Sequence, residues 1–408
     1  MRIFIKSAVI SSVLLILSWL ILAIPARMAA IFPEQFAFAE FNLSDILFSL
    51  QHNPRYRSEI VLIDCGEADR GRIAKAITVL EADRPKVVGL DFIFNCPDGV
   101  NDTTTCPQIR DSKGVLELSL ALQKNKNIVL ASALRQSLHA RLNHDDDPDS
   151  MELADPIYSR YVDNGFTNLV SNGGHVSIIR EFSPTRRVRG EDVSCFSLLV
   201  ARSFNASATQ QFLTNSRPEE IINFSGNISP GIEQSYRGIY QVYEIDDLFS
   251  GQYSQGDFQG KIVLLGFLGG KSRGSINDKF FTPINPVPLG RSYPDMYGLV
   301  IHANIVSQIL DGIHIRKLNF AEECLAAFLF GLAQITLLIT AKRKSRKWFF
   351  MIAVLAMMAM LTLSSLLRTW LFIEFGLISD FQITFVTILI SALLLNTYDA
   401  VLEKPMEG

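Results

Sequence analysis

Two aspartates hold equivalent places in the sequence, each at or near the end of an apolar run. Asp64 lies in IVLIDC (60–65) and Asp91 in KVVGLDFIF (86–94). If both runs are strands of one parallel sheet, the two carboxylates lie at its carboxyl edge, where ligands of such sheets collect. There they could share a cation, hold a ligand amine or polarise water. The structural alternative is that they accept hydrogen bonds from backbone amides and organise loops.

A glycine-rich run at 266–274 imitates two catalytic motifs without meeting the requirements of either. It resembles a phosphate-binding loop, but only three residues separate its first glycine from Gly-Lys-Ser, where four are needed. It also spells G-x-S-x-G, and Ser272, Asp295 and His302 follow the chain order of a hydrolase triad. A nucleophile elbow joins a strand directly to a helix, whereas loop residues follow this strand. A connecting loop is the favoured interpretation.

The acidic run HDDDPD, at 144–149, offers the oxygen ligands that calcium prefers. Its spacing is not that of an EF-hand loop, so we expect a solvated loop. The sequence therefore predicts no metal site and no cofactor.

Four apolar stretches account for an unusual composition. The 408 residues are 48% hydrophobic and 19% charged, and the mean hydropathy is +0.22. The excess lies in the stretches 7–24, 325–341, 348–367 and 377–395. Each is close to the ~20 residues that a helix needs to cross a bilayer, so the lipid bilayer is the first expected partner. The net charge of −3 provides no general attraction for nucleic acid.

These stretches predict the domain organisation. We expect an N-terminal anchor (1–30), a globular domain (31–318), a transmembrane helix (319–341), a basic loop (342–347), two further transmembrane helices (348–398) and a stub (399–408). The first stretch could instead be a cleaved signal peptide. Its apolar run exceeds the ~7–15 residues usual in such a peptide, which favours a retained anchor.

The basic loop gives the orientation. Residues 342–347 carry five cations, and basic residues in short loops stay on the cytoplasmic side. Both chain ends are then cytoplasmic, and the large domain lies outside a bacterial cytoplasmic membrane. Asp380, in the fourth stretch near Glu374, has two interpretations: a helix-contact or relay role inside the membrane, or an interfacial position reached by tilting the span.

This location permits disulfides. Cys96 and Cys106 flank the short loop NCPDGVNDTTTCP, and we predict that they form one. Cys65 and Cys195 are expected to be buried thiols, and Cys324 to lie in the membrane.

The large domain alternates continuous apolar strands with amphipathic helices. Strands are expected at IVLIDC, KVVGLDFIF, NIVLASA (127–133), EIINFSG (220–226) and KIVLLGF (261–267). Such strands predict an α/β fold with a mainly parallel sheet covered on both faces. The alternation across 164–189, with Gly173-Gly174, predicts an inserted β-hairpin.

Several of these segments carry a family resemblance. VLIDCGEADRGRIAKAITVLEADRPKVVGLDFIFNCPDG, GFTNLVSNGGHVSIIREF with VSCFSLLVARSF, and IINFSG through NDKFFTPINP to GLVIHANIVSQILDG stand in one order. This series resembles the second CHASE family, the cyclase/histidine-kinase-associated sensory extracellular domains, over about residues 42–397. The sequence lacks the Trp-Pro-Arg that is common at the family's first helix.

The resemblance implies a sensory domain followed by three transmembrane helices. By the same match, Asp278 and Thr282 in NDKFFTP, and His302 in the final helix, join Asp64 and Asp91 as ligand-pocket candidates. His302 has apolar neighbours, which also favours a packed role.

Our functional hypothesis is a non-enzymatic membrane sensor that binds an unknown signal or partner. The family usually continues into a cytoplasmic output domain, whereas this sequence ends soon after the fourth stretch. We therefore expect a separate protein to provide the output. The rival hypothesis is a structural or docking subunit of a membrane complex, and the weakest is an extracytoplasmic hydrolase. A homo-oligomer is left open.

Overall fold

The computed structural model describes residues 2–31, 45–49, 56–96, 110–136, 148–169, 178–228, 238–270, 278–285, 293–344 and 347–391. The chain forms two compact units. The helical unit comprises Met1–Leu47 and Ile315–Gly408, and the α/β unit comprises Phe48–His314. The expected domain limits stay predictions, because compactness does not by itself locate a membrane.

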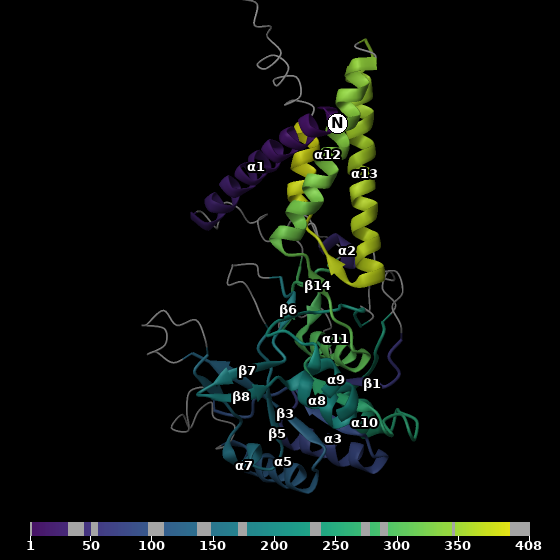
Figure 1. The fold of residues 1–408 in the computed structure, drawn as a ribbon. Coiled ribbons are helices and arrows are strands. Elements are labelled where there is room, and N and C mark those ends of the chain that lie inside the picture. The colour runs from purple at the N-terminus through teal and green to yellow at the C-terminus, as the bar shows by residue number, and fades with distance from the viewer. Residues whose placement is uncertain are drawn as a thin grey trace, which may run out of the picture. The chain divides into compact units, whose positions relative to one another are not determined.

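The α/β unit is built on a seven-stranded sheet in the order β10-β1-β11-β2-β3-β4, with β5 also beside β3 (Figure 1). All strand pairs are parallel except β3 with β4. The strands are β1 (Ile60–Asp64), β2 (Val87–Leu90), β3 (Ile128–Arg135), β4 (Ser150–Glu152), β5 (Asp163–Phe166), β10 (Gln241–Glu244) and β11 (Ile262–Gly266). The mixed α/β fold with a parallel-rich sheet is thus confirmed.

The central strands are apolar without alternation because helices cover both faces of the sheet. Every residue of β1, β2 and β11 is buried. Figure 1 shows α3, α5 and α7 on one side of the strands and α8, α9 and α11 on the other. The first group consists of α3 (Arg70–Asp83), α5 (Ser112–Lys124) and α7 (Pro156–Ser159), joined by α10 (Ile245–Ser250) in the same core. The second consists of α8 (Phe196–Phe204), α9 (Ala206–Thr214) and α11 (Gly298–Asp311).

Gly89 shows how closely the second layer approaches the sheet. A Cβ atom at this position of β2 would lie 2.7 Å from the Leu264 side chain and 2.8 Å from the Phe196 ring. Glycine therefore allows α8 to pack directly on β2.

Three short antiparallel pairs complete the α/β unit. They are β6 (Glu181–Phe182) with β9 (Glu220–Ile221), β7 (Thr185–Val188) with β8 (Glu191–Ser194), and β12 (Lys279–Phe280) with β13 (Met296–Tyr297). The predicted hairpin over 164–189 does not begin as expected, because β5 is a parallel strand of the main sheet. Gly173-Gly174 lies outside the described residues, so the inserted hairpin itself stays a prediction.

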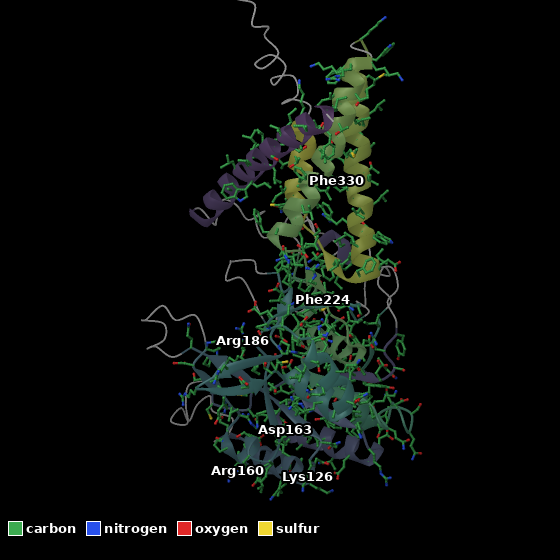
Figure 2. All side chains as sticks on the ribbon, in the orientation of Figure 1. Lys126, Arg160, Asp163, Arg186, Phe224 and Phe330 are labelled. Atoms are coloured by element: carbon green, nitrogen blue, oxygen red, sulfur yellow. The ribbon has the colours of Figure 1, made fainter. Side chains whose placement is uncertain are left out.

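Among its described residues, the helical unit contains three helices long and apolar enough to cross a membrane. They are α1 (Arg2–Ile31), α12 (Phe320–Lys344) and α13 (Phe349–Phe375). A shorter apolar helix, Gln382–Ser391, follows, and the residues after 391 lie outside the described part. Within this unit Phe330, in α12, meets the Phe381 ring edge-on at 6.3 Å (Figure 2). The short helix α2 (Asp45–Ser49) lies near the division between the units in the sequence.

The fourth apolar stretch begins differently from the prediction. Its first residues form β15 (Leu377–Ile378), which pairs in parallel with β14 (Arg316–Lys317). Asp380 follows β15, before the helix begins, and its carboxylate lies 2.7 Å from the Lys317 ammonium. This place between elements favours the interfacial interpretation of Asp380 over one in mid-span.

Candidate functional site

A cavity of about 350 Å³ opens at the carboxyl edge of the sheet. Three of the five candidate residues line it: Asp91, directly after β2; Asp278, directly before β12; and His302, in α11. Its size is that of a small-molecule site. The remaining lining residues are Thr167, Asn168, Leu169, Ile179, Phe280 and Gly298. Strands, a loop and a helix far apart in sequence thus converge on one pocket.

His302, which lines this cavity, carries a hydrogen-bond acceptor without a partner among the described residues. The residue is 5% exposed, and its Nδ1 lies 3.0 Å from the Ser197 hydroxyl. That hydroxyl also donates to the His302 carbonyl oxygen at 3.4 Å, so we assign the imidazole proton to Nδ1. Burial lowers the His302 pKa to about 4, so the ring is neutral at pH 7. Nε2 then carries a lone pair and has no partner among the described residues.

Asp91 is a partly buried carboxylate with no partner among the described residues. Among the described residues, nothing donates a hydrogen bond to it or forms an ion pair with it. Removal from water disfavours its charged form and raises its pKa to about 6. A charged group in such surroundings costs free energy unless a ligand pairs with it, which is unusual for a residue with only a structural role.

Asp278 faces the same cavity from a left-handed backbone conformation, with φ +58°. Its pKa is raised to about 7, first by desolvation and then by the charge of Asp91. Its side chain is exposed, so solvent weakens this effect. A Cβ at Gly298 would lie 3.3 Å from the Asp278 carboxylate, so the glycine leaves room for that carboxylate beside the start of α11.

Asp64 has the structural role instead. Its Oδ1 accepts hydrogen bonds from the amides of Gly66 (2.9 Å) and Leu268 (3.0 Å), and its Oδ2 accepts from Gly270 (2.9 Å). Two amides of the phosphate-loop-like run, those of Leu268 and Gly270, are therefore bound by a carboxylate of the same chain. This supports the interpretation of 266–270 as a connecting loop held by Asp64.

Thr282 belongs to a separate buried cluster. Its amide (2.9 Å) and hydroxyl (2.5 Å) donate to Asp295, which also accepts from Asn285 at 3.1 Å. Burial raises the Asp295 pKa to about 6, and these hydrogen bonds oppose the shift. Asp295 and His302 thus have different partners and do not form the acid–base pair of a triad. Ser272, the third member, lies outside the described residues.

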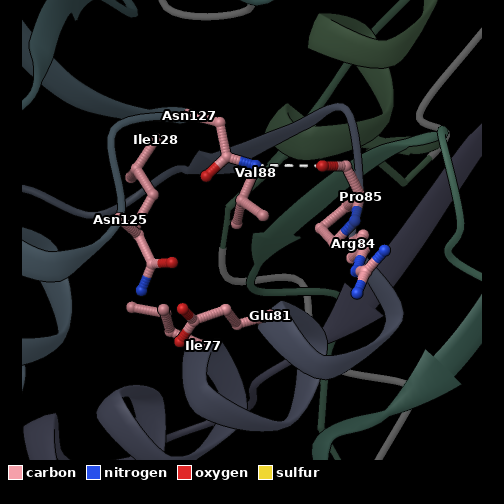
Figure 3. Close-up of a pocket in the computed structure, with 8 residues that line it drawn as sticks. All are labelled: Ile77, Glu81, Arg84, Pro85, Val88, Asn125, Asn127 and Ile128. Carbon is pink, nitrogen blue, oxygen red and sulfur yellow. Dashed lines mark hydrogen bonds between the residues drawn. The ribbon is translucent and has the colours of Figure 1, made fainter.

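A second, smaller cavity of about 190 Å³ lies at the opposite, amino edge of the sheet (Figure 3). Three of its four polar side chains already have partners, and the fourth is Arg84. The Asn127 amide donates to the Pro85 carbonyl at 2.9 Å, and the Asn125 amide donates to Ala121 at 2.9 Å. Glu81 pairs with Lys124 at 3.3 Å. This cavity therefore offers a ligand less than the first.

The cysteines follow the prediction in part. Cys65 and Cys195 are buried free thiols, and Cys324, in α12, is also free. Cys106 lies outside the described residues, so the disulfide with Cys96 stays a prediction. Most of the acidic run at 144–149 lies outside them as well.

Sequence reasoning missed the polar residues that fix α11. Asn304 accepts from the Ser225 amide (2.8 Å), and Gln308 accepts from the Asn223 amide (2.8 Å). The expected strand over 220–226 is consequently reduced to β9, because side chains of α11 satisfy the backbone beyond it. Two amides four residues apart in an apolar helix were the available signal. Ser197, which positions His302, had no such signal.

Comparison with known families agrees with this architecture. The profile of the CHASE2 domain matches residues 15–340, most of the chain. The chain belongs to the CHASE2 domain family. CHASE2 is a family of extracellular sensory domains, and the apolar helices indicate a membrane protein. No curated protein and no solved structure matched the chain in the comparisons.

Proposed function

We propose that this CHASE2 protein is a non-enzymatic sensor of a bacterial cytoplasmic membrane. Its α/β unit lies outside the cytoplasm and binds a signal in the cavity lined by Asp91, Asp278 and His302. The membrane helices relay occupancy to a separate protein. The observation that carries the proposal is a ligand-sized cavity whose free acceptors include a residue of α11, the helix that leads into the membrane helices.

The covalent path from the cavity to the helical unit is short. Gly298 and His302 line the cavity, and α11 ends at Asp311 with Gly312 in a left-handed cap. After residues 313–315, the chain enters β14 and then α12. A ligand that shifts α11 along or about its axis would therefore move the residues that lead into α12.

Within the helical unit, β14 also reaches the third and fourth apolar segments. Its backbone pairs with β15, with Arg316 N donating to Gly376 O at 2.9 Å and Leu318 N to Ile378 O at 2.8 Å. Because β15 joins α13 to the helix Gln382–Ser391, movement of β14 would act on the ends of three apolar helices together. This ribbon gives the relay a defined mechanical element.

The orientation rests on charge. The basic residues at 342–347 favour a cytoplasmic loop between α12 and α13. The start of α12, which follows β14, and the end of α13, which precedes β15, then lie on the opposite side of the membrane. The output protein would contact the cytoplasmic ends of the helices.

Filling each cavity in turn tests the relay without knowledge of the signal. In the full chain in lipid nanodiscs, Leu169→Trp fills the large cavity, and Glu81→Trp fills the small one as a matched control. Hydrogen exchange is measured at the amides of Arg316 and Leu318. We expect Leu169→Trp to change their exchange by threefold or more, and Glu81→Trp to leave it unchanged.

Two results would reject the relay. One is unchanged exchange in a Leu169→Trp protein that melts within a few degrees of wild type. The other is an equal change in both variants. A protein partner that binds constitutively and stoichiometrically, with the same affinity for wild type and for Leu169→Trp, would favour the docking-subunit alternative.

A further inference from the structure

Three residues that line the cavity at the carboxyl edge carry hydrogen-bond acceptors. Asp91 and Asp278 contribute carboxylates, and neither has a hydrogen-bond or ion-pair partner among the described residues. His302, which is only 5% exposed, also lines the cavity, and its Nε2 has no hydrogen-bond partner among the described residues. A ligand with a positive charge and several N–H donors is the chemical complement of such a wall.

The other polar side chains of the cavity are already engaged. Thr167 Oγ1 donates to the Ser132 carbonyl at 3.2 Å. The Asn168 amide accepts from Leu134 N at 2.6 Å and donates to Leu134 O at 3.1 Å. These two side chains therefore hydrogen-bond to the backbone of β3. Among the described residues, the acceptors that remain for a ligand are the two carboxylates and the imidazole.

A neighbouring cation does not neutralise the carboxylates within the described residues. Lys279, next in sequence to Asp278, lies over the Tyr297 ring at 4.8 Å instead. The charge of Asp91 repels that of Asp278, so the cavity is lined by two like charges whose repulsion a bound cation would relieve.

Asp91, Asp278 and His302 do not form a metal site. Among the described residues, no group of three histidine, cysteine or acidic side chains lies close enough to hold a metal ion. Metal ligands lie ~2.0–2.6 Å from their ion, whereas hydrogen-bond acceptors lie ~2.7–3.2 Å from an ammonium nitrogen, so acceptors too widely spaced for a metal ion can still surround an ammonium group. Phe280, Leu169 and Ile179 add an apolar wall that a hydrocarbon chain can cover, and an aromatic face also attracts an ammonium group.

We propose that the signal recognised by this cavity is a small organic amine in its protonated form. The ammonium group donates to Asp91, Asp278 and His302 Nε2, while the ligand's carbon chain packs on Phe280, Leu169 and Ile179. This inference rests on the proposed function for the location of the signal site, and it adds the chemical class.

Calorimetric titration of the full chain in nanodiscs at pH 7.5 tests the class directly. The probes are butylamine and 1,4-diaminobutane, with 1-butanol, butyrate and magnesium chloride for comparison. We expect the amines to bind, with the alcohol, the anion and the metal at least about tenfold weaker, because a charge-assisted hydrogen bond is worth about that factor or more.

Variants assign the binding to this cavity. Asp91→Asn and Asp278→Asn should each weaken amine binding by about tenfold or more, and the double variant should lose it. His302→Phe, which keeps a ring beside Phe196 but lacks Nε2, should weaken it severalfold. Asp163→Asn, at the start of β5 (Figure 2), is the matched control and should bind as wild type does. A thermal melt of each sample confirms folding, and Asp91→Glu should bind better than Asp91→Asn.

Three results would overturn the amine assignment. They are absence of amine binding at ten millimolar, equal amine binding by wild type and Asp91→Asn, and tighter binding of magnesium, butanol or butyrate than of butylamine. None of these results changes the outcome of the hydrogen-exchange experiment with Leu169→Trp, which tests the relay. Failure of the ligand class and failure of the sensor function are therefore distinguishable.

Discussion

Asp64 and Asp91 end neighbouring regions of the same sheet edge, but their surroundings are opposite. Asp64 closes β1 and accepts hydrogen bonds from three backbone amides. Asp91 follows β2, faces a cavity and accepts none from the described residues. The difference arises because the loop after β11 turns back over β1, whereas the chain around β2 leaves room for a cavity. A carboxylate at a strand end thus becomes a loop anchor or a ligand group according to which loop covers it.

The largest expected effect is the loss of the Asp64 anchor. Asp64→Ala leaves the amides of Gly66, Leu268 and Gly270 without their acceptor, and we expect the free energy of unfolding to fall by about 3–5 kcal/mol. Thermal unfolding of the full chain in nanodiscs should show a decrease in Tm of about 10 °C. A change below about 2 °C would mean that these hydrogen bonds do not hold the loop.

The segment that follows Asp91 should be stabilised by the predicted disulfide between Cys96 and Cys106. If Cys96 and Cys106 are paired, Cys106→Ser removes a disulfide that closes a short loop, and we expect the free energy of unfolding to fall by about 3 kcal/mol. Peptide mass analysis without reductant should find the linked pair in wild type. Cys324→Ser, at a free thiol, is the control and should not change the linked mass. Unlinked peptides in wild type would show the prediction to be wrong.

The pH dependence of stability should distinguish Asp91 from a satisfied carboxylate. Its pKa rises from 3.8 in the unfolded chain to about 6 in the folded protein, so the folded state binds the proton more tightly. Its contribution therefore favours folding below pH 4 and is lost as the pH rises through about 6. Asp91→Asn removes this loss. Between pH 4.5 and 7.5 the free energy of unfolding of the variant should therefore rise relative to wild type by about 1–3 kcal/mol, and its Tm should rise relative to wild type in parallel. A constant difference would contradict the pKa shift.

The smallest expected effect concerns the buried acid that does have partners. Thr282→Val removes the hydroxyl that donates to Asp295, and we expect a loss of about 1 kcal/mol with amine binding unchanged. Calorimetry and thermal unfolding of the same sample measure both. A tenfold weaker amine affinity would instead connect this cluster to the cavity.

The main framework was predictable from the sequence because its signals are local. Continuous apolar runs identified β1, β2, β3 and β11, and the helix of α3 ended where Pro85 follows. The rule that ligands collect at carboxyl strand ends, together with the family resemblance, brought Asp91, Asp278 and His302 into one list.

The division of that list was not predictable, because it depends on contacts distant in sequence. Two of the three amides that donate to Asp64, those of Leu268 and Gly270, lie some 200 positions away in the sequence. Thr282 does not line the cavity, because its amide and hydroxyl donate to Asp295 instead. Ser197 entered the site because α8 packs on the sheet at Gly89, a contact that hydrophobic periodicity does not encode.

One paired measurement tests the central contrast most directly. Asp64→Asn and Asp91→Asn make the same isosteric change at the same sheet edge, and their melting temperatures can be compared with wild type at pH 7.5 without ligand. The structure predicts opposite signs: Asp64→Asn loses an acceptor for the Gly270 amide and melts lower, whereas Asp91→Asn removes an uncompensated charge and melts higher. If both variants melt lower by similar amounts, Asp91 is a structural carboxylate like Asp64, and the cavity is not a site held ready for a cationic ligand.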